Sequence, residues 1–384
     1  MKKHSVLLGM LALVSTATAA MADITVGVVL STTGPAASLG IPEKNSLEFA
    51  PKTIAGQNIK YIVYDDATDT TTTVQNVKRL ISESNVDLII GPSTTPTTMT
   101  VVNVASEANT PMISLASASP IVKPIEKRKW IFKVPADDEI TASVMVDHMA
   151  KLKIKSVAII ATDDPYGEAN TVAFKNFADK KGIKTTTIEK YKKNDTSAMA
   201  QVLKSISGKP DAVYVVAAGT PSAMPHVTLI ERGYKGKIYQ SHGAANSDFL
   251  RVGGKALEGA YIPASPVLVA EQLPNDYPNK KESLNFTKMY EGKFGPRSTF
   301  ASHTWDALHI MEGAVPKALK VAKPGTPEFR AALRDAIEAT KGYKGAYAVY
   351  NMSPTDHSGV SEAGIAMLKI VNGKWKLESV SHYK

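Results

Sequence analysis

The feature that most constrains the fold is an alternation of short apolar runs with helix-type segments, which the chain goes through twice. The first round opens at 24–30 with a continuous apolar run, typical of a strand that is covered on both faces. Further strands are predicted at 60–64, 87–90, 111–115 and 130–134. Since strands that alternate with helices form parallel sheets, the first round predicts one sheet wrapped in helices.

A second round of the same kind begins after Pro135-Ala136-Asp137-Asp138, with strands predicted at 156–161, 184–188, 212–216 and 238–240. Two of its helices end at Gly182 and Gly233, because glycine readily adopts the left-handed conformation that closes a helix. Helices at 283–291, 299–319 and 327–340 and a hairpin at 364–380 complete the prediction. The expected fold class is therefore α/β, with two Rossmann-like lobes around two parallel sheets.

The late helices have no strands of their own to cover, so we expect them to pack on the first sheet while the hairpin joins the second. The chain then crosses between the lobes more than once, which makes a hinge, and the cleft at the hinge is lined by the C-terminal ends of strands. The predicted bounds are 23–136 and 266–350 for lobe 1, and 137–265 and 351–384 for lobe 2.

The N-terminus indicates export. Lys2 and Lys3 precede a short apolar core at 6–14, and Ala20-Met21-Ala22 supplies the small residues that a signal peptidase reads. We therefore expect a signal peptide at 1–22 and a periplasmic mature chain. No later stretch approaches the ~20 apolar residues of a membrane span, and the absence of cysteine removes a lipid-attachment site. The mature protein is expected to diffuse freely.

Composition and motifs exclude several function classes. The formal charge is +9, but the lysines are spread along the chain and the cluster at 123–129 is interrupted, so we expect no nucleic-acid partner. The sequence has no cysteine, no nucleophile elbow, no phosphate-binding loop and no zinc-protease motif. The acidic pairs Asp65-Asp66 and Asp163-Asp164 are typical of turns and caps. We expect no enzyme activity, no metal and no cofactor.

The informative loops are those that follow strands in this fold: 31–40, 91–98, 114–120, 163–168, 218–222 and 241–243. In the second of them Thr94 or Thr95 is predicted as a helix N-cap, with Pro96 in the first turn. Unpaired N–H groups and hydroxyls at the positive end of a helix form an anion site, to which the 116–118 loop would add backbone donors. This predicts a carboxylate ligand, unless the hydroxyls only cap their own helices.

At these loops the chain resembles the branched-chain amino-acid binding proteins of ABC uptake systems, the Leu/Ile/Val-type periplasmic family. The resemblance runs from residue 23 to about 384, and its carriers are 24–40, Tyr64-Asp65-Asp66, Ile90-Gly91, 111–120 and Asp164-Pro165-Tyr166-Gly167. It implies a type I periplasmic binding fold with three crossovers, in which the lobes close over the ligand. It also implies delivery to a membrane permease that a separate ATPase drives. We expect a monomer without enzyme activity.

The departures from this family concern the ligand. Where members that bind amino acids have an acidic residue for the α-ammonium, this chain has His242; a threonine that also holds the ammonium is replaced by Ala118, and a tyrosine by Leu39. A cysteine pair of the family corresponds to Thr68 and Thr94. The resemblance thus implies that the carboxylate side of the site is kept and the ammonium side is lost.

A buried ammonium without its partner would cost about 3–5 kcal/mol, so an amino acid would bind about 100-fold more weakly or worse. Covering ~150 Å² of an aromatic ring contributes about 4 kcal/mol instead. We therefore predict an aromatic carboxylate of the benzoate or hydroxycinnamate type, with His242 bonded to a distal hydroxyl. The segment Gly219-Thr220-Pro221 also resembles the aromatic-acid branch of the family.

The predicted ligand-binding residues are Leu39, Ser93, Thr94, Thr95, Ala116, Ser117, Ala118, Tyr166, Gly219, Thr220, His242 and His303. Three alternatives stay open. One is a branched-chain amino-acid binding protein, in which His242 faces the hinge and Glu168 pairs with the ammonium. Another is a periplasmic sensor subunit that presents its closed form to a signalling partner. The last is an enzyme on this fold, for which His242, His303 and Tyr166 are the titratable candidates.

Overall fold

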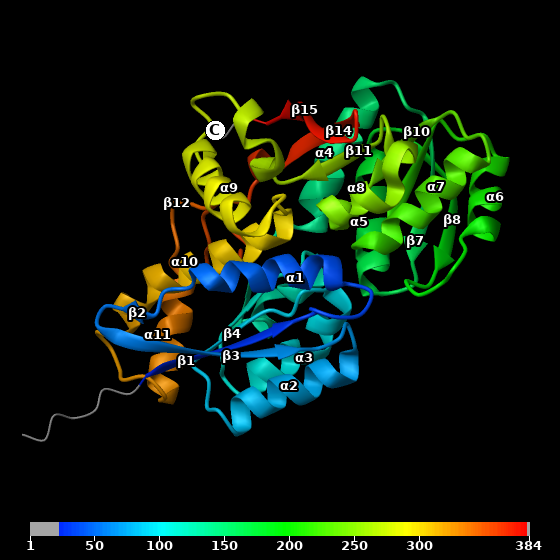
Figure 1. Cartoon of the computed structure of the whole chain (residues 1–384). Coiled ribbons are helices and arrows are strands. Elements are labelled where there is room, and N and C mark those ends of the chain that lie inside the picture. The colour runs from blue at the N-terminus through cyan, green and yellow to red at the C-terminus, as the bar shows by residue number, and fades with distance from the viewer. Residues whose placement is uncertain (1–22, 382–384) are drawn as a thin grey trace, which may run out of the picture.

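The computed structural model describes residues 23–381, so the predicted signal peptide at 1–22 lies outside the described residues. Two α/β lobes lie side by side, each built around its own sheet (Figure 1). The lower lobe in the figure contains the first strands of the chain, and the upper lobe contains the middle of the chain together with the C-terminal hairpin. The predicted α/β class with two mostly parallel sheets is confirmed.

The first sheet has the order β2-β3-β1-β4-β5-β6 among the described residues, and all its pairs are parallel except the short β2 against β3. Its central strand β1 (Ile24–Leu30) is buried on both faces. Val26 and Val28 pack toward helices of the C-terminal half, whereas Val29 packs toward the opposite helix layer. The other strands are β2 (Thr53–Ile54), β3 (Gln57–Asp65), β4 (Leu88–Ile90), β5 (Met112–Ser114) and β6 (Ile131–Lys133).

The second sheet has the order β15-β14-β11-β10-β9-β7-β8. Its parallel strands are β7 (Ser156–Thr162), β8 (Lys184–Tyr191), β9 (Ala212–Val216), β10 (Lys237–Gln240) and β11 (Tyr261–Ala264). The hairpin of β14 (Ala366–Val371) and β15 (Lys374–Val380) adds to β11 in antiparallel fashion, as expected for the C-terminal hairpin. A separate short ribbon is formed by β12 (Tyr343–Lys344) and β13 (Val349–Tyr350).

Helices cover both faces of each sheet. The first sheet carries α1 (Ala37–Ser46), α2 (Thr70–Ser82), α3 (Thr95–Glu107), α10 (Thr299–Ala318) and α11 (Pro327–Glu338). The second carries α4 (Asp138–Lys151), α5 (Pro165–Lys180), α6 (Met199–Ser207), α7 (Ala223–Glu231) and α8 (Ser247–Gly253). Gly182 and Gly233 follow α5 and α7 with positive φ, as predicted.

Helix α9 (Lys280–Phe294) departs from the expectation that the late helices return to the first sheet. Its Phe286 and Tyr290 lie in one apolar cluster with Ile262 of β11 and Leu368 of β14. The reason is connectivity: α9 follows β11 through the short helical segment at 266–272 and packs against that segment. The prediction places all of 266–350 in lobe 1, whereas α9 packs on the second sheet. The other predicted lobe bounds stay a prediction.

Within residues 23–381 the chain passes between the two sheets three times: after β6, between β11 and α10, and between β13 and β14. These passages place the C-terminal ends of β1, β4 and β5 opposite those of β7, β9 and β10. The same part of the chain contains no helix with the length and apolar character that crossing a membrane requires.

Candidate functional site

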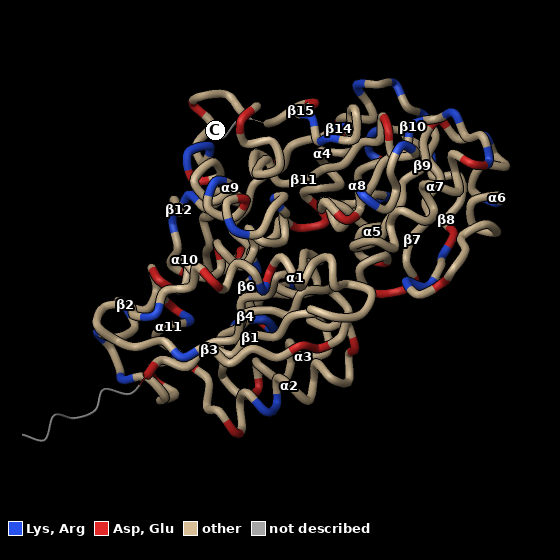
Figure 2. The backbone as a smooth tube through the Cα atoms, in the orientation of Figure 1, with Lys and Arg blue, Asp and Glu red and all other residues tan. Residues whose placement is uncertain are grey.

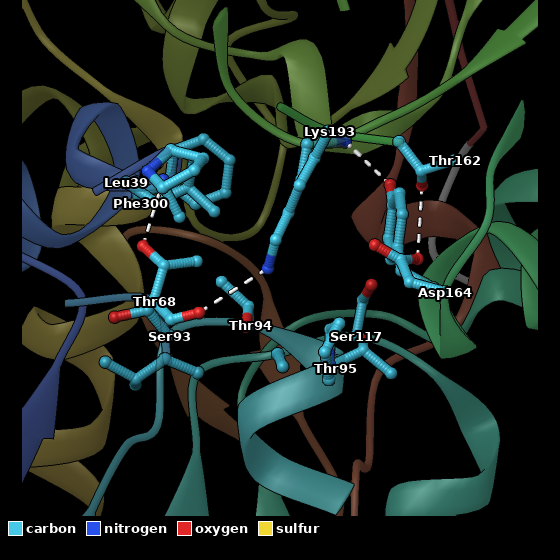
Figure 3. A pocket seen from close by; sticks show the side chains of 18 of the residues that line it. Leu39, Thr68, Ser93, Thr94, Thr95, Ser117, Thr162, Asp164, Lys193 and Phe300 are labelled. Atoms are coloured by element: carbon cyan, nitrogen blue, oxygen red, sulfur yellow. Dashed lines mark hydrogen bonds between the residues drawn. The ribbon is translucent and has the colours of Figure 1, made fainter. Parts of the chain in front are cut away.

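A pocket lies between the two lobes, where loops from the strand ends of both sheets meet (Figure 3). It contains about 600 Å³ of empty space, part of which is open to solvent. This size lies in the ordinary range for small-molecule sites, about 300–1,000 Å³. The predicted residues among its lining are Leu39, Ser93, Thr94, Thr95, Ala116, Ser117, Tyr166, His242 and His303.

Three predicted residues do not line this pocket. Ala118 is fully buried and packs in the apolar layer beneath the loop, so its side chain faces the core. Gly219 lies instead at the contact between the lobes, because a Cβ placed on it would come within 3.1 Å of Leu39 on the other lobe. Thr220 begins the short helical turn that follows.

One wall of the pocket is the N-terminus of α3. Thr94 is the N-cap and its hydroxyl accepts from the Thr97 N–H at 3.4 Å, with Pro96 in the first turn, as the sequence predicts. The neighbouring Thr95 is different, since its hydroxyl is buried and has no hydrogen-bond partner among the described residues. The first N–H groups of a helix also lack partners within the helix. This wall therefore offers donors that the protein itself does not use.

The loop opposite, after β5, supplies fewer donors than expected. The N–H of Ala116 donates to the Ser114 hydroxyl at 3.1 Å and is not available to a ligand. The backbone N–H and the hydroxyl of Ser117 make no hydrogen bond to other described residues, and the Ser117 side chain points into the pocket in Figure 3. Ser117 is thus the residue of this loop that can bind a polar group.

Ser93 has a structural role at the base of this wall. Its hydroxyl accepts from the Ser31 N–H at 2.9 Å and donates to the carboxyl group of Glu43. Glu43 is fully buried in α1, and this burial raises the pKa of its carboxyl group well above the usual value. The Ser93 hydroxyl therefore joins β1, α1 and the loop after β4, and its one O–H donor is not available to a ligand.

An aromatic wall faces these donors. The rings of His242 and His303 are nearly parallel with centroids 5.8 Å apart, and Phe300 meets His303 edge-on at 5.4 Å. Tyr347 lies beside His303 at 4.9 Å, and Tyr166 closes the second-lobe side, where its hydroxyl accepts from the Gly243 N–H at 2.9 Å. Leu39 and Phe300 lie together on one side of the pocket in Figure 3. This arrangement provides aromatic surfaces against which a ligand ring can pack.

The aromatic wall is uncharged near neutral pH. Burial, together with the nearby charge of Lys133, lowers the pKa of His242 to about 4. Burial and the neighbouring His242 lower the pKa of His303 well below its usual value. Burial raises the pKa of the Tyr166 hydroxyl to about 12. All three groups are therefore uncharged in the free protein at pH 7.

Two charged side chains line the pocket. Lys193, from the loop after β8, extends across it in Figure 3, and its Nζ lies 3.5 Å from the carbonyl oxygen of Thr68 on the other lobe. Asp164 is the N-cap of α5, where its Oδ1 accepts from the Gly167 N–H at 2.9 Å and from the Thr162 hydroxyl at 3.1 Å. The pocket therefore contains one lysine ammonium, from Lys193, and one carboxylate, from Asp164, which is hydrogen-bonded within the N-terminus of its own helix.

A second cation lies behind the pocket. Lys133 of β6 is fully buried, with its Nζ 2.6 Å from Asp137 Oδ1 and 2.7 Å from the carbonyl oxygen of Pro135, which lines the pocket. Elsewhere Lys and Arg are distributed over both lobes with Asp and Glu among them (Figure 2). Among residues 23–381 no three His, Cys, Asp or Glu side chains are grouped so that they could hold a metal ion.

Sequence reasoning missed part of the lining: Pro35, Ala36, Thr68, Pro96, Leu115, Pro135, Thr162, Asp164, Lys193, Ala218, Pro221, Gly243 and Phe300. Most of these lie in loops that were recognised as strand ends, and Lys193 follows a predicted strand in the same way. Phe300 gave no such signal, because it belongs to a helix whose place beside the cleft depends on the passage of the chain back to the first lobe.

Comparisons with known proteins concern the chain as a whole. A family model described as periplasmic binding protein matches residues 23–374. Leu/Ile/Val-binding protein homolog 3 of Brucella melitensis is 24% identical over 348 residues, 88% of this chain and 89% of that protein. An extracellular ligand-binding receptor from Rhodopseudomonas palustris HaA2 is 42% identical with a TM-score of 0.90, covering 93% of this chain and 100% of that one.

A third comparison gives the fold alone. The solute binding protein of an ABC transporter from R. palustris, solved in complex with benzoate, is 18% identical with a TM-score of 0.81, and the match covers 94% of this chain and 97% of that one.

Proposed function

Because the chain belongs to the periplasmic binding protein family, we propose that it captures an aromatic carboxylate of the benzoate or hydroxycinnamate type between its lobes. It then delivers this ligand in the periplasm to the membrane permease of an ABC uptake system, which a separate ATPase drives. The observation that carries the proposal is the pairing of an uncharged aromatic wall with unused donors across one pocket. No chemical step is part of this function.

The donors suit a carboxylate. The N-terminus of α3 has a partial positive charge, and the Thr95 hydroxyl beside it is buried without a partner. Ser117 faces it from the next strand end, and the Lys193 ammonium adds a positive charge within the pocket. A carboxylate placed here accepts hydrogen bonds from groups that otherwise lack partners, which removes the cost of their burial.

The opposite wall suits a ring. Phe300, His242 and His303 supply aromatic faces, while Leu39 and Leu115 supply aliphatic contacts. Burying ~150 Å² of ring surface here contributes about 4 kcal/mol. A charged substituent on the ring would find no opposite charge among these side chains.

The arrangement is unfavourable for an α-ammonium. His242 is neutral, and Glu168, the acid that an amino-acid ligand would need in its place, is not among the lining residues and lies 3.4 Å from Lys190 at the surface. Asp164 does line the pocket, and its second oxygen is the one feature that favours a branched-chain amino acid as the alternative ligand. The names of the curated relatives point the same way.

A thermal-shift panel separates the two ligands. Mature protein is heated with benzoate, hydroxycinnamate, leucine, isoleucine, a short aliphatic acid and the matching amides. A ligand with a micromolar Kd adds about 4 kcal/mol at millimolar concentration, which is easily detected. Stabilisation by the aromatic acids and by neither leucine nor the amides is the expected result. Stabilisation by leucine or isoleucine alone would overturn the proposal.

A further inference from the structure

His303 of α10 lies against the pocket with only 1% of its surface exposed. Neither ring nitrogen has a hydrogen-bond partner of normal geometry among the described residues. The Leu115 backbone acts on this ring as a hydrogen-bond acceptor, which raises the pKa of His303 against the larger lowering by burial. Burial of an imidazole nitrogen without a partner is unfavourable and uncommon in native structures.

Two other buried histidines, neither of which lines the pocket, are hydrogen-bonded at both ring nitrogens. His226 is bonded at both nitrogens, to the Ala256 carbonyl and the Gln240 side chain, each at 3.0 Å. His357 is bonded to the Ile131 carbonyl at 2.8 Å and to Glu338 at 3.0 Å. His303 thus differs from both of these histidines, and also from His242, which lines the pocket but has the Tyr347 hydroxyl 3.4 Å from its Nε2.

The chemistry of the missing partner follows from the ring. A neutral imidazole has one N–H and one nitrogen with a free lone pair. If the N–H is directed to the Leu115 carbonyl, the second nitrogen is an acceptor, and only a donor can satisfy it. The rings of Phe300, His242 and Tyr347 surround His303 with centroids 5.4, 5.8 and 4.9 Å away. A hydroxyl attached to an aromatic ring matches both requirements.

We propose that His303 is the specificity-determining residue of the pocket and accepts a hydrogen bond from a hydroxyl group on the ligand's ring. The preferred ligand is then a phenolic acid, and the unsubstituted acid is a weaker one. This proposal rests on the proposed function, since it presupposes an aromatic carboxylate.

Matched pairs of ligands test it by calorimetric titration: 4-hydroxybenzoate against benzoate, and 4-hydroxycinnamate against cinnamate. The hydroxylated member should bind about 10- to 100-fold more tightly, the usual effect of satisfying one buried polar group. The 4-methoxy acids, which accept hydrogen bonds and donate none, should lose this preference. These titrations use the wild-type protein, so they do not depend on the folding of a variant.

A substitution at His303 tests whether this residue causes the preference for the hydroxylated ligand. His303→Phe keeps an aromatic ring and removes both nitrogens, so the ratio of the two affinities should fall to about one. His309→Phe is the matched control on the same helix: His309 is half-buried, its Nδ1 lies 2.8 Å from the Trp305 carbonyl, and it does not line the pocket. This control should keep the wild-type ratio.

The outcomes are distinguishable. Equal affinity of wild-type protein for both members of each pair overturns the role of His303 and leaves the proposed function intact. An equal loss for both acids in His303→Phe would place His303 against the carboxylate and also overturn it. Binding of no aromatic acid at all would overturn the proposed function, and this proposal with it.

Discussion

Thr94 and Thr95 are neighbours in one loop, yet their hydroxyls have different surroundings. The Thr94 hydroxyl is bonded to Thr97 in the cap of α3, while the Thr95 hydroxyl is buried without a partner beside the pocket. A hydroxyl that contributes nothing to the free protein is most simply explained by a ligand that uses it. We therefore expect Thr94 to contribute to the stability of α3 and Thr95 to contribute to ligand binding.

Thr95→Val tests this separation. The variant should bind the carboxylate ligand about tenfold more weakly, which corresponds to one lost hydrogen bond. Its free energy of unfolding should be unchanged or slightly higher, since the hydroxyl has no partner to lose. Titration and urea denaturation measure the two quantities. Thr100→Val on the exposed face of α3 is the control, and equal affinities of the two variants would rule out a role for Thr95.

His242 should make the protein sensitive to acid. Its folded pKa of about 4 lies below the ~6.5 of an unfolded histidine, so between these values only the unfolded state binds the proton. Stability from this group is therefore complete above pH 6.5 and is lost as the pH falls toward 4. At pH 4.5 the loss amounts to about 2–3 kcal/mol.

The variant His242→Phe has no proton to bind at this position. In urea denaturation its unfolding free energy should drop by about 2–3 kcal/mol less than that of the wild type between pH 7.5 and pH 4.5. Parallel pH profiles for the two proteins would mean that the ring is protonated in the folded protein, against the burial described above.

The reach of sequence reasoning can be seen at single residues. Thr95, Ser117 and Tyr166 were predictable because parallel strands gather their following loops at one edge. Ala118 was predicted wrongly as a lining residue: the loop direction was correct, but consecutive side chains point to opposite sides, and this one enters the core. Phe300 was missed, since nothing local in a helix tells which lobe it will cover.

At the scale of loops and helices, Gly219 lies where the two lobes touch. Its φ is +74°, and an added Cβ would lie 2.8 Å from Ser38 Oγ and 3.1 Å from Leu39 Cδ1. The positive φ favours glycine because of the backbone. The two short distances favour glycine because the other lobe comes close. A side chain at this position would press against the Ser38 and Leu39 side chains of the other lobe.

Gly219→Ala should therefore weaken ligand binding about tenfold, the effect of modest overpacking. Its stability should fall by about 1–3 kcal/mol, because φ +74° with ψ −155° is a backbone region that essentially only glycine adopts. Gly182→Ala is also at a positive φ (+67°) but has nothing within 4 Å of the added Cβ, so it should lose stability with no effect on affinity. Equal affinities of the two variants would argue against a lobe contact at Gly219.

The elements that the sequence did not reveal have physical explanations. The strand β11 is only four residues long and contains Pro263, which is uncommon in a central strand. It is tolerated here because β11 pairs with the hairpin strand on one side and has a single paired position with β10 on the other. Helix α9 was predicted, but its packing on the second lobe depends on contacts that no local pattern contains.

At the scale of the whole molecule, one apolar cluster joins the lobes. Trp305 of α10 is 4% exposed and meets Phe49 at 5.8 Å and Phe286 of α9 at 5.4 Å. The same cluster includes Ile262 and Leu368 of the second sheet. Because this apolar cluster contains residues of both lobes, we expect that unfolding of one lobe would expose part of the core of the other.

Scanning calorimetry should therefore give a single unfolding transition for the free protein. Trp305→Ala should lower the unfolding free energy by about 3–5 kcal/mol, as expected for a large core deletion. Trp130→Ala, at a half-buried position outside this cluster, should cost less. Two separate transitions in the wild type would show that the lobes are independent.

The division of the pocket between the lobes also has a kinetic consequence. The unused donors, Thr95 and Ser117, belong to the first lobe, whereas His242, Tyr166 and Lys193 come from the second. A ligand can then dock on the first lobe through its carboxylate before the second lobe arrives. Changes in the first lobe should alter how fast the ligand is captured, and changes in the second should alter its dwell time. If the proposed ligand binds in this order, the association rate depends mainly on the first lobe and the residence time mainly on the second.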